Sequence, residues 1–327
     1  MKQVSGHNDT ALIVAYYGKI PPYLPLFLDS CKQNADIDFI FFTDWNCEQL
    51  ISSENIKFIK SSLDEFNELS NSKIRIGNVV TPYKLCDLKP AWTHIFEDYL
   101  REYEFVGYCD IDLIFGRISE FFSEDVKRRC DMFSITTSYL SGALTIFKNT
   151  PQMRTLYQKA SGWRYIFSDA RHWAFDEYLR IDNAKSDDAK ANKLESFSDL
   201  VFSSRSNVVL ENSRYIGLES IPDLVTYDNG RWLDKEAREY VFFHFVGAKQ
   251  NPMWTTPNWE SLPEKFFVNK YGFFKYGESP LRCRDLFIQP YLRKQILRNW
   301  KNKLKTARKL IHNMDVKMLV RGIKKYI

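Results

Sequence analysis

Two aspartates one residue apart, Asp110 and Asp112, are well suited to hold a metal ion. They follow a short apolar run at 105–109 that is typical of a strand buried in a sheet. In an open α/β sheet, ligands bind at the edge where the strands end. Carboxylate oxygens suit Mg²⁺ or Mn²⁺, which keep coordination positions open for a diphosphate. The alternative is a solvated turn, but the apolar flanks disfavour it, because two such charges repel each other there without a cation.

A histidine follows another apolar, strand-like run much later in the chain. His244 is followed at offsets of three and five residues by Gly247 and Lys249. An imidazole can complete a metal site begun by two carboxylates. A glycine lets the backbone approach a phosphate closely, and a lysine can neutralise it. A histidine at a strand end can also simply pack on aromatic residues, but this spacing favours a site. We therefore predict that His244 joins Asp110 and Asp112 as a metal ligand.

An acidic pair, Asp176 and Glu177, is the best candidate for acid–base chemistry. A carboxylate can remove the proton from an attacking hydroxyl. An acidic residue can also orient a substrate and stabilise positive charge on it. The alternative is an exposed pair on a helix between Arg171 and Arg180. We predict both acids as catalytic residues, with Asp176 ahead of Glu177.

The elements that must position these residues follow from hydrophobic periodicity. Apolar runs bounded by turns predict strands at 11–16, 39–42, 56–59, 105–109, 132–135, 143–147, 208–210 and 240–245. Helical spacing is found at 23–32 and 83–100. Pro90 is expected to start or kink the second helix, and Ser62 with Glu65 forms a capping-box pattern. The polar segment 184–199 is interpreted as a loop. Alternating strands and helices predict an α/β fold with a largely parallel sheet.

Composition indicates a folded chain with a distinct basic end. The 327 residues are 44% hydrophobic and 16% aromatic, enough for a sizeable core. No apolar window is long enough for a membrane helix, and the N-terminus lacks a signal-peptide core. The six cysteines show no paired spacing, so we expect reduced thiols in the cytoplasm. Residues 282–327 carry 14 Lys and Arg against 2 Asp and Glu. With Trp300 and several Leu and Ile at roughly helical spacing, this tail suits an anionic membrane surface.

Longer stretches of the sequence carry a family resemblance. They are Ala15-Tyr-Tyr-Gly18, Phe41-Phe-Thr-Asp44, Tyr83-Lys-Leu-Cys-Asp-Leu-Lys-Pro90 and Gly107-Tyr-Cys-Asp-Ile-Asp-Leu-Ile-Phe-Gly116. Together with the His-Phe-x-Gly-x-Lys element at 244–249, they resemble metal-dependent glycosyltransferases of the GT-A fold, and most closely a bacterial polysaccharide-biosynthesis family. The 244–249 element is similar to that of glycogenin-type and lipopolysaccharide galactosyltransferases. There a Pro-Trp directly follows the lysine, whereas here Trp254 comes five residues after Lys249. The resemblance covers roughly residues 10–255.

The resemblance implies a GT-A fold, a Rossmann-like and mostly parallel sheet flanked by helices, and a donor-binding role for further residues. The residues implied in binding the nucleotide-sugar are Ala15, Tyr16, Tyr17, Asp44, Lys84, Asp87, Lys89, Asp110, Ile111, Ser141, Gly142, Gly247 and Lys249. For several of these residues, a purely structural role remains an alternative. Asp44 could cap a turn, Lys84 and Lys89 could lie on a solvated helix face, and Ser141-Gly142 could be an ordinary strand-start turn.

The expected function is therefore that of a hexosyltransferase. It moves a sugar from a nucleotide-sugar, with a UDP-sugar and a galactose-type sugar favoured, to a lipid-linked saccharide of a bacterial O-antigen, capsule or lipopolysaccharide. Mn²⁺ or Mg²⁺ is the expected cofactor, and its role is to stabilise charge on the leaving UDP. The expected domains are a GT-A domain at 1–280 and a basic amphipathic helical tail at 281–327. The tail is expected to hold the protein at the inner face of the cell membrane.

Other readings stay open from sequence. A sugar-nucleotide pyrophosphorylase would show a Gly-rich loop after the first strand, and Gly18-Lys-Ile-Pro-Pro22 does not supply one. A non-catalytic adaptor that binds membrane or a polyanion through the tail would not need three metal-binding side chains. The tail could instead pack on the body or on another subunit. We expect no nucleic-acid partner. The sugar, the acceptor, the linkage, the stereochemical outcome and the oligomeric state are not defined by the sequence.

Overall fold

The computed structural model describes residues 8–47, 50, 53–77, 79, 81–180, 185–220, 224–246, 254, 257 and 259–275. The predicted tail at 281–327 lies outside the described residues, as do Gly247 and Lys249. Within the described part, no helix is both long and apolar enough to span a bilayer.

A seven-stranded sheet forms the centre of the molecule, in the order β3-β2-β1-β4-β7-β6-β8. Its strands are β1 (Thr10–Ala15), β2 (Asp38–Thr43), β3 (Ile56–Lys60), β4 (Phe105–Cys109), β6 (Met132–Ser134), β7 (Leu144–Lys148) and β8 (Leu210–Glu211). Strands β3, β2, β1 and β4 are parallel, and β6 pairs in parallel with β8, whereas β7 is antiparallel to both of its neighbours. The predicted α/β class with a mostly parallel sheet is confirmed.

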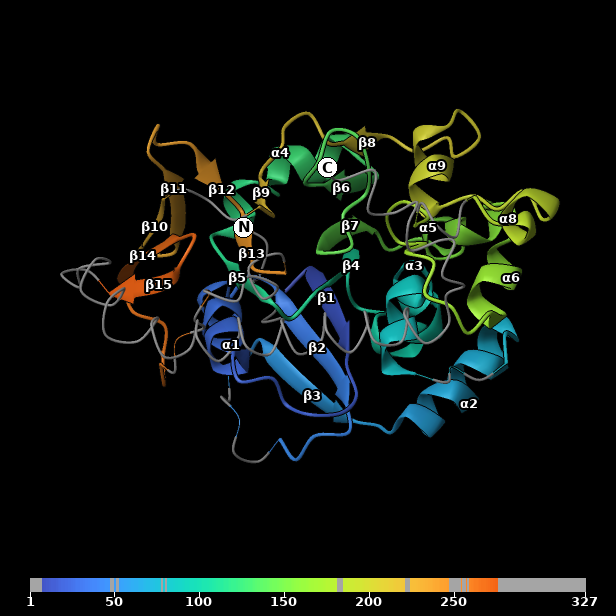
Figure 1. Ribbon diagram of the computed structural model, residues 1–327, viewed down its shortest axis with the longest axis horizontal. Coiled ribbons are helices and arrows are strands. Elements are labelled where there is room, and N and C mark those ends of the chain that lie inside the picture. Colours follow the sequence, from blue (N-terminus) through green and yellow to red (C-terminus); the bar gives the residue numbers. More distant parts are fainter. Residues whose placement is uncertain are drawn as a thin grey trace, which may run out of the picture.

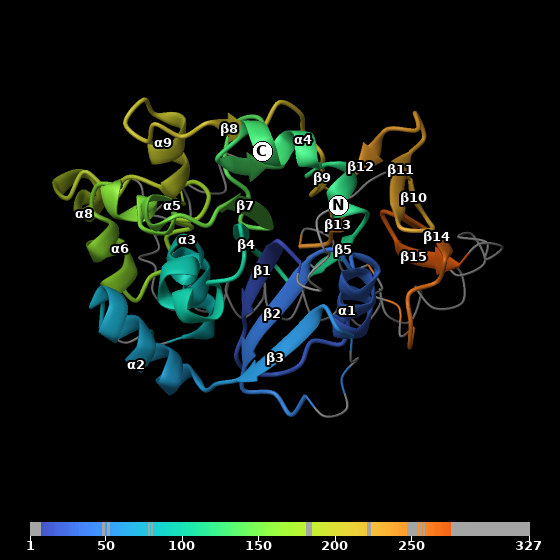
Figure 2. The same cartoon turned by 180° about the vertical axis from the view of Figure 1, so that it is seen from behind.

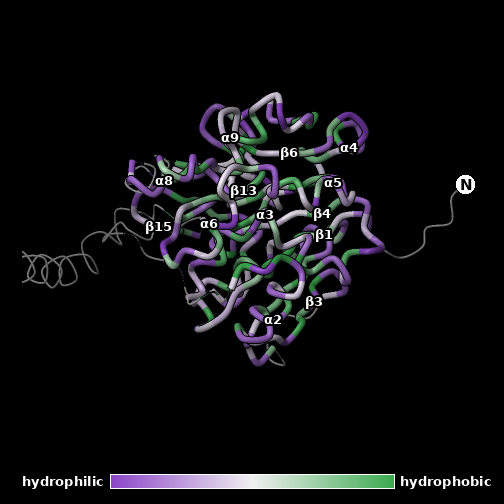
Figure 3. Tube along the Cα trace, turned by 90° about the vertical axis from the view of Figure 1, so that its right-hand side faces the viewer, coloured by the Kyte–Doolittle hydropathy of each residue, from purple (hydrophilic) through white to green (hydrophobic). Residues whose placement is uncertain are grey.

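Helices cover both faces of this sheet (Figure 1). In β1, Leu12 and Val14 share a core with α1, while Ala11 and Ile13 share a core with α3. Successive side chains of a strand point to opposite faces. Because both faces are covered, every residue of β1 is buried, which explains its continuous apolar sequence. Coloured by hydropathy, the inner strands carry many of the hydrophobic segments, while outer loops are largely hydrophilic (Figure 3).

The helices gather mainly on one side of the sheet, as the view from behind shows (Figure 2). The α-helices are α1 (Leu24–Gln33), α2 (Leu63–Ile74), α3 (Leu85–Ile95), α4 (Glu124–Arg129), α5 (Pro151–Arg154), α6 (Trp163–Ser168), α8 (Asp187–Ala191) and α9 (Phe197–Phe202). The 3-10 helices are η1 (Pro82–Lys84), η2 (Glu97–Tyr99), η3 (Ile118–Glu120) and η4 (Leu156–Lys159).

Two smaller sheets lie beside α1. The first, in the order β5-β13-β9, consists of β5 (Leu113–Phe115), β9 (Gly217–Leu218) and β13 (Phe242–His244). The second, in the order β12-β11-β10-β14-β15, consists of β10 (Val225–Asp228), β11 (Arg231–Asp234), β12 (Glu239–Tyr240), β14 (Lys265–Asn269) and β15 (Gly272–Lys275). Leu26 of α1 and Ile114 of β5 belong to the core of the second sheet. Trp254 packs there too, with its ring 5.9 Å from that of Phe243.

Most local predictions agree with the structure, but the helix start expected at Pro90 and the loop expected at 184–199 do not. Ser62 and Glu65 form the predicted capping box. However, α3 begins at Leu85 and continues through Pro90, so the proline does not start the helix. The segment 184–199 is not a plain loop, because Ser186 accepts a hydrogen bond from the backbone N–H of Ala189 and starts α8. The five-stranded antiparallel sheet was not predicted beyond the run at 240–245.

Candidate metal and nucleotide site

Three strand ends bring the predicted metal ligands together. Asp110 follows β4 directly, and Asp112 immediately precedes β5. Strand β13 is antiparallel to β5, and its last residue, His244, pairs with Leu113. The backbone N–H of Phe245 donates to the carbonyl of Asp112 at 3.1 Å. This pairing brings residues that are far apart in the sequence to one sheet edge.

The three side chains are close enough to share one ion. His244 Nε2 lies 3.3 Å from Asp112 Oδ1 and 3.9 Å from Asp110 Oδ2. One ligand atom from each residue lies within 4.8 Å of the others. Two carboxylates and an imidazole are a donor set that suits Mn²⁺, and Mg²⁺ accepts the same oxygens.

The state of His244 fits a cation at this position. The side chain is only 8% exposed, and neither ring nitrogen makes a hydrogen bond with the residues described. Buried polar atoms normally have partners, so two such nitrogens need an explanation. Burial lowers the pKa of His244, but Asp112 and the nearby carboxylate of Glu219 outweigh it and raise the pKa to about 10. The residues present therefore fit a divalent cation, which would replace a proton in this acidic cluster.

Lys89 links this cluster to the acidic pair. Its Nζ donates to Asp110 Oδ1 at 2.7 Å and to the carbonyl of Gly142 at 2.9 Å, and it lies 3.2 Å from Asp176 Oδ2. Burial lowers the pKa of Lys89, but the charges of Asp110 and Asp176 raise it by more. The pKa of Lys89 is therefore above the ordinary value of lysine. Lys89 is thus a buried cation shared by a predicted metal ligand and a predicted catalytic residue.

Asp176 is buried and Glu177 is half-buried, and the pKa of each carboxyl is raised. Burial raises the pKa of Asp176 to about 8, with Lys89 opposing it and Glu177 adding to it. Burial also raises the pKa of Glu177, which accepts a hydrogen bond from the backbone N–H of Gly142 at 2.8 Å. A carboxyl with a raised pKa is suited to exchange a proton with a hydroxyl group. The bland alternative of an exposed pair does not hold for Asp176, which is 3% exposed.

Gly142 permits this close arrangement. A Cβ atom added there would lie 2.4 Å from Asp176 Oδ2, 3.1 Å from Glu177 Oε1 and 3.1 Å from Lys89 Nζ. Any larger residue would push the carboxylates and the lysine apart.

A cavity of about 630 Å³ opens over these side chains. Ten of the residues predicted for the site line it: Ala15, Tyr16, Tyr17, Lys89, Asp110, Ile111, Asp112, Asp176, Glu177 and His244. Tyr16 and Tyr17 follow β1, the strand next to β4, so they lie on the same carboxyl edge. Cavities of this size and mixed polarity are typical of small-molecule sites.

Other predicted residues lie outside the lining of this cavity. Asp44 is exposed at the end of β2, where its Oδ1 accepts a hydrogen bond from the N–H of Gly18 at 2.9 Å. Ser141 is fully buried and contacts the site through Glu219. The roles of these residues in donor binding stay predictions.

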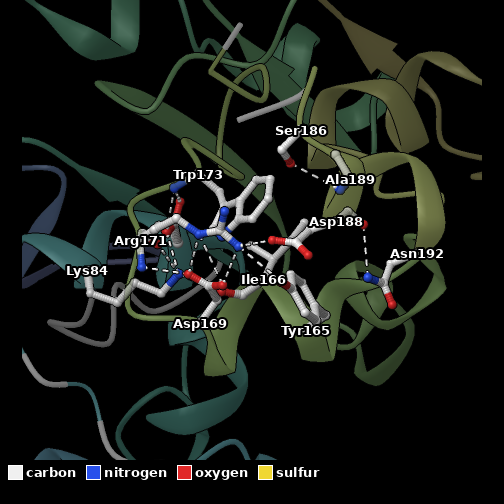
Figure 4. A network of polar contacts seen from close by, with 11 residues as sticks. Lys84, Tyr165, Ile166, Asp169, Arg171, Trp173, Ser186, Asp188, Ala189 and Asn192 are labelled. Atoms are coloured by element: carbon white, nitrogen blue, oxygen red, sulfur yellow. Dashed lines mark hydrogen bonds and ion pairs between the residues drawn. The ribbon is translucent and has the colours of Figure 1, made fainter. Parts of the chain in front are cut away.

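Lys84 and Asp87 form a buried ion pair away from the cavity wall. Lys84 Nζ donates to Asp87 Oδ2 at 2.7 Å and to the carbonyl of Arg171 at 2.8 Å. Figure 4 shows Lys84 reaching the turn that contains Asp169 and Arg171. Asp87 also accepts hydrogen bonds from the N–H groups of Trp173 and Phe175. This pair thereby fixes the segment that leads into the acidic pair.

The sequence reading missed two residues of the site, Tyr139 and Glu219, which also line the cavity. Glu219 directly follows β9 and is held by Tyr139, whose hydroxyl donates to Glu219 Oε2 at 2.6 Å. The available signal was an acidic residue after the short apolar run at 216–218. That run is too short to identify as a strand without its partner.

Comparisons with known proteins give a family and a weak structural likeness. A family described as "Family of unknown function (DUF6625)" matches residues 12–276. The chain is similar to the galactosyltransferase LgtC in complex with donor and acceptor sugar analogs, with 14% identity, a TM-score of 0.33, and coverage of 62% of this chain and 85% of that chain. For an active-site mutant of LgtC, the identity is 14% and the TM-score is 0.33, with coverage of 64% of this chain and 88% of that chain. For the mannosyltransferase Ktr4p from S. cerevisiae, the identity is 12% and the TM-score is 0.32, with coverage of 64% of this chain and 68% of that chain. No curated protein matches the chain. TM-scores this low carry no functional argument, so function must be inferred from the site itself.

Proposed function

We propose that this chain, which belongs to the family of unknown function DUF6625, is a metal-dependent glycosyltransferase. The observation that carries the proposal is the convergence of Asp110, Asp112 and His244 within 4.8 Å beside a cavity of about 630 Å³. An adaptor or a structural protein has no need for such a cluster of charges, which is costly to bury without a ligand.

On the donor side, Asp110, Asp112 and His244 would hold Mn²⁺ or Mg²⁺. When bound, the cation supplies positive charge to the diphosphate of a nucleotide-sugar as that group leaves. Tyr16 and Tyr17 line the adjoining wall. Tyr17 is buried in the core, and the half-buried ring of Tyr16 is the surface that we propose for the nucleoside. A UDP-sugar, with a galactose-type sugar first, is the donor that we propose.

On the acceptor side, Asp176 is the candidate that exchanges a proton with the attacking hydroxyl. Its carboxyl is buried beside Lys89, which keeps a fraction of it ionised at neutral pH despite the raised pKa. Two aromatic residues near the pair leave part of their rings exposed. Tyr83 is 63% exposed, and its ring centre lies 4.5 Å from that of His172 with the two rings tilted. Tyr178 is 47% exposed, and its ring centre lies 5.4 Å from that of Tyr139. Exposed rings beside hydrogen-bonding carboxylates suit a saccharide.

We further propose that the acceptor is a lipid-linked saccharide of a bacterial surface polysaccharide, and that the protein works at the inner face of the cell membrane. The support for this is the positive charge of residues 282–327, which include 14 Lys and Arg but only 2 Asp and Glu. Each basic residue near an anionic membrane contributes about 1 kcal/mol to binding.

The test of the function is hydrolysis of a panel of UDP-, GDP- and dTDP-sugars by the full chain, with Mn²⁺ and with EDTA. We expect slow, Mn²⁺-dependent release of one nucleoside diphosphate by the parent. Asp112→Ala should lose this activity, and Asp125→Ala, which changes an exposed carboxylate far from the site, should keep it. Hydrolysis of no donor, or equal hydrolysis with EDTA, would refute the proposal.

A further inference from the structure

Glu219 lies beside His244 because two short strands pair in parallel. In the sheet β5-β13-β9, Phe242 pairs with Gly217 and Phe243 with Leu218. The same register places Glu219 next to His244 at the sheet edge. Because residues two apart in a strand face the same way, Glu219 lies on the face of Gly217 and His244 on the face of its partner Phe242. Asp112 reaches this edge from β5, on the other side of β13.

The carboxylate of Glu219 is held in place on both of its oxygens. Tyr139 donates its hydroxyl to Oε2 at 2.6 Å, and Ser141 donates its hydroxyl to Oε1 at 2.9 Å. Each oxygen of Glu219 therefore acts as a hydrogen-bond acceptor in the structure. An ionised carboxylate accepts hydrogen bonds and cannot donate one.

The two nitrogens of His244 face different groups. Nε2 faces the aspartates, with Asp112 Oδ1 at 3.3 Å, whereas Nδ1 faces Glu219 Oε1 at 3.7 Å. A neutral imidazole carries one proton, and the group that the other nitrogen faces decides which nitrogen keeps it. Both nitrogens therefore face carboxylates. With a cation held by Asp110 and Asp112, the lone pair of Nε2 would face that cation, and Glu219 would hold the proton on Nδ1.

We propose that Glu219 is a positioning residue that fixes the orientation and tautomer of His244 for a divalent cation bound at Nε2. This inference rests on the metal site of the proposed function. Tyr139 and Ser141 fix Glu219 in turn. The arrangement gives Ser141 a role that differs from the predicted contact with the donor sugar.

Metal affinity tests the inference without any sugar substrate. We expect Mn²⁺ affinity of Glu219→Ala, measured by titration calorimetry, to fall about 10- to 100-fold. Glu219→Gln should fall less, because its amide oxygen can still accept a hydrogen bond from Nδ1. Glu239→Ala is the matched control, since Glu239 is half-buried and pairs with Arg231 away from the cavity. Circular dichroism checks that every variant folds.

A spectroscopic readout separates positioning from general damage. With Zn²⁺ as a diamagnetic substitute, ¹⁵N-histidine spectra of the parent should show His244 protonated at Nδ1, with the signal assigned by its loss in His244→Ala. In Glu219→Ala we expect this tautomer to lose its dominance. Unchanged Mn²⁺ affinity and tautomer in Glu219→Ala would overturn the inference. A loss in Glu219→Gln as large as in Asp112→Ala would also overturn it, because Glu219 would then be a ligand. If the variants behave as expected but no nucleotide-sugar is hydrolysed, the proposed function fails and the positioning role stands.

Discussion

Two groups of acidic and histidine side chains lie close together in this molecule, and they differ in how their hydrogen bonds are used. Asp110, Asp112 and His244 form one group, and Asp87, His172 and Asp176 form another of similar composition and spacing. By residue type alone, either could hold a metal ion.

The difference lies in the partners. Asp87 is fully buried and accepts hydrogen bonds from Lys84 and from two backbone N–H groups, so its oxygens are already satisfied. In the other group, Asp110 and Asp112 line the cavity, whereas Asp87 does not. A saturated carboxylate stabilises the fold, whereas carboxylates that line a cavity can take a ligand. The comparison predicts that metal binding and stability depend on different aspartates.

The largest effect is expected for Asp112→Ala. A metal ligand contributes several kcal/mol, so Mn²⁺ affinity should fall by more than about 100-fold, at 1.36 kcal/mol for each factor of ten. Titration calorimetry measures this. The free energy of unfolding should fall by less than in an Asp87 variant, because Asp112 shares its surroundings with like charges. Full Mn²⁺ affinity in Asp112→Ala would remove the distinction between the two groups.

Asp176 is the member of the second group that Lys89 links to the first, and it sharpens the comparison. For Asp176→Asn we expect sugar transfer to fall about 10²- to 10⁴-fold, the usual contribution of a general acid or base. Mn²⁺-dependent nucleotide affinity should stay near that of the parent, because Asp176 meets the metal cluster only through Lys89. Transfer rates with the donor found in the panel, together with nucleotide titrations, check both. Transfer within a few-fold of the parent would mean that Asp176 acts only in the fold.

Asp87→Ala should act on stability. Removing one partner of a buried ion pair leaves Lys84 uncompensated and costs about 3–5 kcal/mol. Urea unfolding measures the loss, and Asp44→Ala, at an exposed carboxylate, is the control with little change. The folded fraction of the Asp87 variant should still bind Mn²⁺. Loss of Mn²⁺ affinity without loss of stability would place Asp87 among the metal ligands.

The smallest expected effect is on the pH dependence of protein stability, through Asp169 near the Asp87 group. Hydrogen bonds from Arg171 lower the pKa of Asp169 to about 2, with burial opposing. A lowered pKa in the folded state stabilises the protein above the ordinary value of Asp, and this contribution is lost as the pH falls toward about 2. The stability difference between the parent and Asp169→Asn should therefore shrink between about pH 5 and about pH 3. Thermal unfolding at both pH values checks this, with the exposed Asp125→Asn as a control. A constant difference would contradict the assignment.

Features that depend on residues adjacent in the sequence could be predicted from it. The strands β1 to β4 and the acidic turn after β4 were readable, since a buried strand with charges at its end is a local pattern. The hydrogen bonds that satisfy the Asp87 carboxylate could not be predicted, because their donors Trp173 and Phe175 come from a distant segment. Glu219 was missed for the same reason, since its place follows from the register of β9 on β13. Short strands whose pairing is long-range leave little periodicity to detect.

The three-stranded sheet β5-β13-β9 also couples the site to folding. Its strands come from three widely separated parts of the chain, so the metal ligands meet only after long-range contacts have formed. An unfolded chain presents no such cluster, and a cation that binds only the native state stabilises it by mass action. If the proposed site binds Mn²⁺, added Mn²⁺ will act as a probe of the completed tertiary structure, and the apparent melting temperature of the protein is expected to rise with its concentration.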